Sequence, residues 1–156
     1  MYLLARDTVN GAEGKIFVTV DGKQIEVANC KNVTTNAEIQ GDDMRVIGTR
    51  TIQNKSNGAK LTGTMEVYYG SSLWTDMVLQ YINTGNMPHF DMQITNYDPT
   101  TSVGRQTMRY YGCELTGTVP LSILNSDEAM LSQEINFTYT RVALLDAFNE
   151  PTEYGG

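Results

Sequence analysis

The feature that most constrains the fold is a regular alternation of polar and apolar residues between Lys60 and Tyr69. Successive side chains of a β-strand point to opposite faces, so a period of two predicts a strand with one face in water and the other against a core. Antiparallel sheets commonly have one solvated face, and strands of this kind are typical of them. The solvated set is Lys60, Thr62, Thr64, Glu66 and Tyr68, and the core-facing set is Leu61, Met65, Val67 and Tyr69.

The same period recurs elsewhere along the chain. A strand is predicted at residues 15–20, followed by Asp21-Gly22, a strong signal for a two-residue hairpin turn, and a returning strand at 24–27. A longer hairpin is predicted over residues 44–69, with its turn at Asn54–Gly58. Further strands are predicted at residues 89–96, 105–116, 118–124 and 133–141, with a short helical turn at 126–130.

One helix is predicted between the hairpin and the later strands. Ser71 or Ser72 can cap its start, and Gly85 can end it. Its apolar residues recur at helical spacing and form one stripe, which we expect to cover the core. The stripe consists of Leu73, Trp74, Met77, Val78, Tyr81 and Ile82.

These elements predict a mainly β protein: an antiparallel β-sandwich or split barrel with one flanking α-helix and a protruding β-hairpin. No repeat, low-complexity block or proline-rich linker divides the 156 residues, so we expect a single domain. Residues 1–13 are predicted to form an N-terminal arm, and residues 142–156 a C-terminal tail.

Composition excludes several classes of function. The chain has 18 acidic and 11 basic residues, a net charge of -7, so its surface repels DNA and anionic lipid. No apolar run reaches the length of a membrane span, and the first seven residues do not resemble a signal peptide, so we expect the chain to be made in, and initially to stay in, a cytoplasm. A reducing cytosol makes a disulfide between Cys30 and Cys113 improbable, and we expect both to behave as small hydrophobic residues.

A search for reactive groups predicts no catalytic residue, no metal site and no cofactor. His89 is the only histidine, whereas zinc sites normally combine several His or Cys ligands. Asp42 and Asp43 are adjacent, so on a strand they point to opposite faces, and no calcium-loop pattern surrounds them. Tyr68-Tyr69 and Tyr110-Tyr111 could form a stacking platform, but tyrosine is also common in strands and at subunit contacts.

Short motifs in a fixed order give the chain a resemblance to a known family. They begin with Gly11–Lys15 and Val18–Gly22 and continue through Ile47–Arg50 and Gly58–Thr64. After the helix come Pro88–Ile94, Gly104–Gln106, Tyr111–Leu115 and Glu134–Tyr139. In this order, over nearly the whole chain, they resemble the tube proteins of contractile phage tails of the XkdM type, found in defective prophages of Gram-positive bacteria and in R-type bacteriocins.

The resemblance implies a structural subunit without enzymatic activity. Six copies would close into a ring, each would contribute strands to a continuous barrel around a lumen, and rings would stack through the protruding hairpin and the terminal arms. The implied partners are further copies of the chain, a tail sheath protein, a baseplate or tube initiator and a tape measure protein in the lumen. The tube would conduct DNA or ions in a particle released from the host cell.

Charge placement suggests where such contacts lie. Residues 42–64 hold four basic and two acidic residues, whereas residues 126–156 hold one basic and six acidic residues, a pairing suited to head-to-tail association or merely to a solvated surface. The predicted inter-ring contacts are Thr49, Arg50, Lys55 and Lys60. A polar, net-negative bore would not retain a polyanion, and the residues predicted to line it are Glu26, Glu38, Gln40, Thr62, Thr64 and Glu66.

Two other functions fit a chain of this kind. A β-sandwich binding module for carbohydrate or adhesion would be a stable monomer with exposed aromatic residues around a groove, but the single tryptophan falls on the helix stripe. A tube subunit of a type VI-like injection system would share the architecture, and the motif order favours the phage-tail side.

Overall fold

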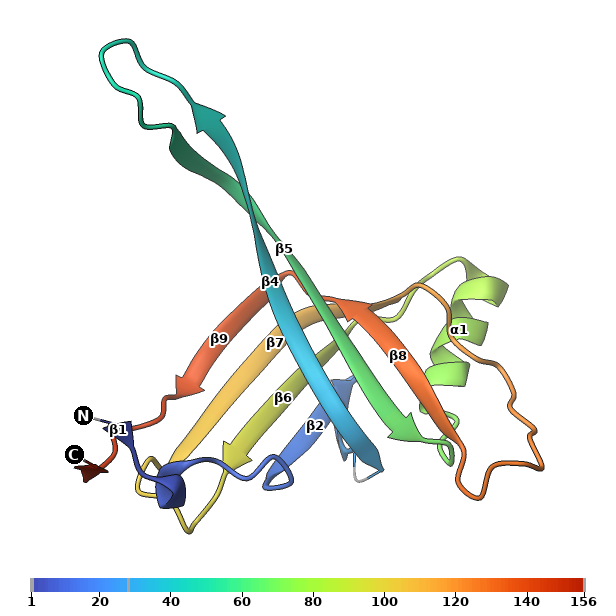
Figure 1. The fold of residues 1–156 in the computed structure, drawn as a ribbon. Coiled ribbons are helices and arrows are strands. Elements are labelled where there is room, and N and C mark those ends of the chain that lie inside the picture. Colours follow the sequence, from blue (N-terminus) through green and yellow to red (C-terminus); the bar gives the residue numbers. More distant parts are fainter. Residues whose placement is uncertain (1, 28, 156) are drawn as a thin grey trace.

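The computed structural model describes residues 2–27 and 29–155, and the ends of the predicted arm and tail, Met1 and Gly156, lie outside them. Its strands are antiparallel, and eight of them form one sheet in the order β3-β2-β6-β7-β8-β5-β4, with β9 paired to β7 (Figure 1). The main elements are β2 (Gly14–Val20), β3 (Lys23–Glu26), β4 (Cys30–Met44), β5 (Gln53–Tyr68), α1 (Leu73–Thr84), β6 (Phe90–Tyr97), β7 (Arg105–Thr116), β8 (Ser132–Thr138) and β9 (Arg141–Asp146). Near the termini lie β1 (Tyr2–Leu3), the 3-10 turn η1 (Ala5–Asp7) and β10 (Tyr154–Gly155).

The sheet folds over on itself because β7 belongs to both of its halves. The first part of β7 lies between β6 and β9, and Glu114–Thr116 at its end pair with β8. One half is therefore β3-β2-β6-β7-β9 and the other is β4-β5-β8-β7, with the core between them. This confirms the predicted mainly β, antiparallel architecture with one flanking helix, and the described strands do not close into a barrel.

Alternation places the core as the sequence predicts. Met65 and Val67 on β5 are fully buried and lie beside Ile135 and Gln133 of β8. Aromatic rings extend the same core: Phe90 contacts both Trp74 and Phe137 edge to face, at centroid distances of 5.7 and 6.3 Å. Burial of these large side chains supplies most of the favourable free energy of folding.

The short hairpin turn is also confirmed. Asp21 and Gly22 both have positive φ, 52° and 77°, as a two-residue turn of the favoured twist requires. Asp and Gly tolerate that conformation at low cost, which fixes the pairing of Val20 with Lys23.

The long hairpin differs from the prediction in both its start and its turn. Its first strand is β4, which begins at Cys30, and the turn occupies residues 45–52. Asn54–Gly58 lies inside β5, because a β-bulge opposite Gln40 and Gly41 absorbs the extra residue there. The side-chain amide of Asn57 donates to Asp42 at 2.8 Å across this bulge, and the left-handed residue of the true turn is Gly48 (φ 98°).

The helix begins and ends where predicted. Gly85 has a left-handed conformation and donates its N–H to the carbonyl of Tyr81, a usual way to end a helix. Only part of the predicted stripe covers the core, however: Trp74 and Met77 are buried, whereas Tyr81 and Ile82 are 49% and 62% exposed. Within the described residues, neither α1 nor η1 is long and apolar enough to cross a membrane.

The last third of the chain contains three corrections. Residues 118–124 form no strand, and residues 126–130 form turns and bends without a helix. The strand predicted at 133–141 is two strands, β8 and β9, so the predicted tail from residue 142 begins inside β9. Thr140 separates them, and its N–H donates to Tyr111 of β7, which redirects the chain onto the other half of the sheet.

The arm and the tail are folded against each other. β1 pairs with β10, so the two ends of the chain lie side by side (Figure 1). Asp7 is buried and accepts hydrogen bonds from the backbone and hydroxyl of Ser102, at 3.0 and 2.7 Å, and that hydroxyl also accepts from the N–H of Thr152. We call this arrangement the terminal clasp.

Candidate functional site

One face of the β4-β5-β8-β7 half-sheet is polar along all four strands. On β4 and β5, the facing pairs Asn36–Thr62 and Thr34–Thr64 lie on the side away from the core, and Thr64 donates to Asn136 of β8 at 3.1 Å. The registers place the following side chains on this polar face: Asn32, Thr34, Asn36, Glu38, Gln40, Lys60, Thr62, Thr64, Glu66, Glu114, Thr116, Glu134, Asn136 and Thr138.

The polar face is net acidic. It carries Glu38, Glu66, Glu114 and Glu134 against Lys60, and Lys31 reaches its margin with its ammonium 3.6 Å from Glu66. Glu66 lies opposite Glu134 in the β5–β8 register, where two like charges repel. Hydrogen bonds donated by Asn32 and Ser132, together with Lys31, hold the pKa of Glu66 below its usual range, so Glu66 stays ionised.

Five of the six residues predicted to line a lumen lie together on this face. They are Glu38 and Gln40 of β4 with Thr62, Thr64 and Glu66 of β5. The sixth, Glu26, lies apart from them on β3, in the other half of the sheet, where it pairs with Phe17. The sequence analysis missed Glu114 and Glu134, although each alternates with core residues in its strand.

The four residues predicted to contact an adjacent ring separate into two groups. Thr49 and Arg50 lie in the turn at the tip of the long hairpin, whereas Lys55 and Lys60 lie within β5. Lys60 faces Glu38 across the strand pair and so belongs to the polar face. The tip also presents apolar side chains, because Val46, Ile47 and Ile52 are all exposed there.

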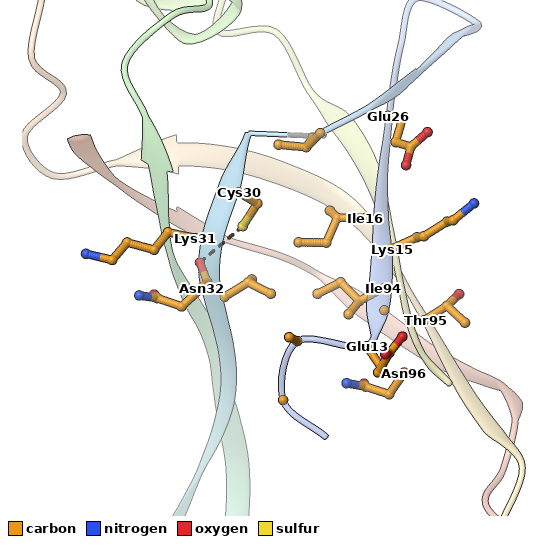
Figure 2. A pocket seen from close by; sticks show the side chains of 15 residues that line it. Glu13, Lys15, Ile16, Glu26, Cys30, Lys31, Asn32, Ile94, Thr95 and Asn96 are labelled. Atoms are coloured by element: carbon orange, nitrogen blue, oxygen red, sulfur yellow. Dashed lines mark hydrogen bonds between the residues drawn. The ribbon is translucent and has the colours of Figure 1, made fainter. Parts of the chain in front are cut away.

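The opening between the two half-sheets is visible in Figure 2. A pocket of ≈ 500 Å³ separates β2 and β3 from the first residues of β4. Ile16 and Ile94 point into it, while the charged ends of Lys15 and Glu26 point away. The thiol of Cys30 donates to the carbonyl of Asn32 at 3.2 Å on the β4 side. This pocket is the place where the sheet fails to close, and polar and apolar residues line it in similar measure.

The described residues hold neither a metal cluster nor a bonded cysteine pair. Among them, no three His, Cys, Asp or Glu side chains lie close enough to hold a metal ion. His89 contacts Glu114 at 3.5 Å, and both side chains are largely exposed. Cys30 and Cys113 are free, and burial raises the pKa of the Cys113 thiol to about 12, so it is a poor nucleophile.

Comparison with known proteins assigns this arrangement to a family. The family model described as "Phage tail tube protein" matches residues 1–146. The chain belongs to the phage tail tube protein family. The "Phage-like element PBSX protein XkdM" of Bacillus subtilis (strain 168) is 28% identical to this tail-tube subunit over 139 residues, which cover 89% of the chain and 91% of the relative.

Solved structures of contractile injection systems share the fold. A chain of the anti-feeding prophage baseplate aligns with a TM-score of 0.65 at 8% identity, over 88% of this chain and 95% of its own. A chain from the sheath–tube complex of an extracellular contractile injection system (PVC) aligns with a TM-score of 0.61 at 17% identity, over 90% and 92%. Membership of a structural tail family points to a role in a particle and away from catalysis.

Proposed function

We propose that six copies of this tail-tube subunit close into a ring, that rings stack into the inner tube of a contractile tail, and that the polar face lines its bore. The tube would conduct DNA or ions. Assembly would take place in the host bacterial cytoplasm, with a tail sheath protein, a baseplate initiator and a tape measure protein as partners, and the finished tail would leave with the particle.

The observation that carries this proposal is the polar face itself. Four neighbouring strands present hydroxyls, amides and a net negative charge on one side while their other side packs the core. A wall of this composition would repel the phosphates of a passing polyanion and offer few Lys or Arg contacts to hold it. It would also be wetted along its length, which suits a conduit for ions.

The number of copies and the stacking rest on two further arguments. The baseplate structure that shares this fold is described as six-fold symmetrised. The long hairpin projects far beyond the body of the subunit (Figure 1), and its exposed apolar tip gives it something to bury in an adjacent ring.

Negative-stain electron microscopy of the purified protein at rising concentration tests the assembly. We expect rings whose class averages have six-fold symmetry, and hollow tubes at higher concentration. A persistent monomer that binds glycans on an array would instead support the carbohydrate-binding module.

A shortened hairpin tests the stacking. Met44 pairs with Gln53, so an Asn-Gly turn can replace residues 45–52 without disturbing β4 or β5. We expect this variant to fold and to form single rings that do not stack. The control keeps the length but replaces residues 45–52 by glycine and serine, which removes the apolar tip alone. Long tubes from both variants would refute the role of the hairpin.

A further inference from the structure

The outward face of the other half-sheet, β3-β2-β6-β7-β9, carries three of the six arginines of the chain. Tyr110 of β7 is buried on the core side, so Arg109 and Tyr111, on either side of it along the strand, lie on the outward side. Arg141 of β9 lies opposite Tyr111, and Arg105 lies four residues before Arg109 on β7. We call Arg105, Arg109, Tyr111 and Arg141 the arginine face.

A chain of contacts holds the middle of this face in place. The guanidinium of Arg109 donates to the side-chain carbonyl of Gln93 at 3.3 Å and lies 3.5 Å from the carboxylate of Asp91. Asp91 in turn accepts a hydrogen bond from the backbone N–H of Gly112 at 3.2 Å. Arg109 also lies over the ring of Tyr111, 5.4 Å from its centre. The charge of Arg109 is therefore used within the subunit, where it fixes the position of Tyr111.

The other two arginines lie over tyrosine rings and keep their hydrogen-bonding groups free. The guanidinium of Arg141 is 4.2 Å from the centre of the Tyr111 ring, and that of Arg105 is 5.4 Å from the centre of the Tyr97 ring. Within the part of the chain that the structure describes, neither side chain forms an ion pair or a hydrogen bond. A guanidinium that is stacked on a ring and has free N–H groups is prepared to bind a carboxylate in a bidentate manner.

The spacing of the two free arginines limits what can bind both. Arg141 lies opposite Tyr111, which is six residues along β7 from Arg105. At about 3.3 Å per residue, the two positions are about 20 Å apart. A single small anion cannot reach both of them. The ligand must be a longer segment that presents at least two acidic groups at about this separation.

The arginine face points away from the polar face. The two half-sheets enclose the core between them, so their outward faces look in opposite directions. If the polar face lines the bore of a tube, the arginine face lies on the outer wall of that tube. The partner that the proposed function places there is the tail sheath protein.

The surroundings of the arginine face favour a protein over a nucleic acid. The chain has a net charge of -7, which repels a polyanion. Two carboxylates also lie beside the arginines: Asp91 next to Arg109, and Asp146 opposite Thr107. A continuous row of phosphates would meet these carboxylates, whereas a protein can place single acidic side chains at Arg105 and Arg141 alone.

We propose that the arginine face is a docking surface for an acidic segment of the protein that encloses the tube, in which Arg105 and Arg141 each bind a carboxylate. The inference rests on the proposed function, which decides that this face lies outside. Tyr111 is a positioning residue: Arg109 holds its ring, and the ring holds Arg141.

Binding of a fluorescein-labelled peptide of ten glutamates tests the surface. The extended peptide is about 33 Å long and can reach both arginines. Its fluorescence anisotropy is measured with the purified full chain at low and at rising salt. We expect Arg105→Gln and Arg141→Gln each to weaken binding roughly fivefold. Arg141→Lys, which keeps the charge and loses the planar fork, should weaken it less than Arg141→Gln.

Two further variants separate position from charge. Tyr111→Leu should weaken peptide binding although no charge changes, because Arg141 loses the ring that holds it. The matched control is Lys55→Gln, which removes one positive charge from the exposed hairpin and should bind the peptide as the wild type does. Thermal unfolding checks that each variant is folded, since Tyr111 is half-buried.

Three results would overturn the docking surface. The first is an absence of peptide binding at low salt, and the second is an equal loss in Lys55→Gln, which would show a response to net charge alone. The third is a ten-nucleotide single-stranded DNA that binds more tightly than the peptide and loses affinity in Arg141→Gln, because it would assign the face to nucleic acid.

Electron microscopy distinguishes this inference from the proposed function. Rings and tubes of Arg141→Gln should look like those of the wild type, because the face lies on the outer wall. If this variant alone fails to assemble, the face is a contact between copies and the docking surface is wrong. If the wild type forms no rings and still binds the peptide through Arg141, the site for an acidic segment stands and the proposed ring is rejected.

Discussion

Gly63 is the position where the smallest possible substitution should have the clearest effect on stability. It lies on the core side of β5, directly opposite Phe137 of β8. A Cβ atom at Gly63 would overlap the ring of Phe137, with Cε2 only 2.6 Å away. Phe137 is fully buried and packed against Phe90 and Tyr139, so its ring has no free space to move into.

The expected cost of Gly63→Ala follows from two opposing effects. Overpacking of a filled core destabilises by about 1–3 kcal/mol. Replacing glycine by alanine within a strand returns about 0.5–1 kcal/mol, because the unfolded chain loses conformational freedom. The net loss should be about 1–2 kcal/mol, a large share of a total stability of about 5–15 kcal/mol.

Urea denaturation measures this loss through the fluorescence of Trp74, the single tryptophan of the chain. Phe137→Leu provides the control, because a smaller side chain makes room for the added methyl group. We expect Gly63→Ala to be less harmful in the Phe137→Leu background than in the wild type. A Gly63→Ala protein as stable as the wild type, or an equal loss in both backgrounds, would refute the packing argument.

Three further predictions concern the core, the terminal clasp and the thiols. Trp74→Ala should cost about 3–5 kcal/mol, measured by thermal unfolding followed by circular dichroism, because the side chain is 1% exposed; an unchanged melting temperature would contradict its burial. Hydrogen bonds from Ser102 lower the pKa of Asp7, so the ionised carboxylate stabilises the folded state above the ordinary carboxyl pKa of about 4, and this stabilisation is lost as pH falls through the lowered pKa. The difference in free energy of unfolding between wild type and Asp7→Asn should therefore shrink in acid. A difference that grows in acid would contradict the lowered pKa. A maleimide should label Cys30 and leave Cys113 unmodified until urea is added, as mass spectrometry would show, whereas rapid double labelling of the folded protein would contradict the burial of Cys113.

The elements that the sequence predicts well are those whose signals are local. Asp21-Gly22 and Gly85 each occupy a conformation that few other residues tolerate, so the turn and the helix end could be placed to the residue. The alternation in the second half of β5 depends only on which side chains meet the core, and it predicted the burial of Met65 and Val67.

The errors occur where pairing between distant residues decides the structure. β4 is almost entirely polar or exposed, so no hydrophobic pattern marks it, and its partner β5 defines it as a strand. Asn54–Gly58 has the composition of a turn, but the bulge opposite Gly41 accommodates it within a strand. Residues 118–124 alternate weakly and leave the sheet, and Pro120, which cannot donate to a β-ladder, is the one local signal against a strand there.

The same dependence on distant pairing limited the prediction of the polar face. The solvent-facing side of each strand could be identified from its own alternation, and five of the six residues predicted to line a lumen lie side by side on the polar face. Glu26 was chosen by the same rule, but the fold of the sheet at β7 places its strand in the other half. Sequence alternation reveals that a residue is solvated and does not reveal which of two solvated faces it occupies.

The free edge of β4 bears on why a ring suits this sheet. A long unpaired edge strand invites uncontrolled pairing, and soluble proteins commonly protect such edges with proline, inward-pointing charge or a covering element. Beyond the body of the subunit β4 has no proline, and its core-side face presents Ala37 and Ile39 where a protected edge would carry a charge. Closure into a barrel removes edges altogether. It does so without the prolines or charges that would also prevent the contact between neighbouring copies. On this reasoning the edge is protected by assembly, so the unassembled subunit should aggregate at high concentration through its unpaired β4, and Ile39→Lys should keep it soluble.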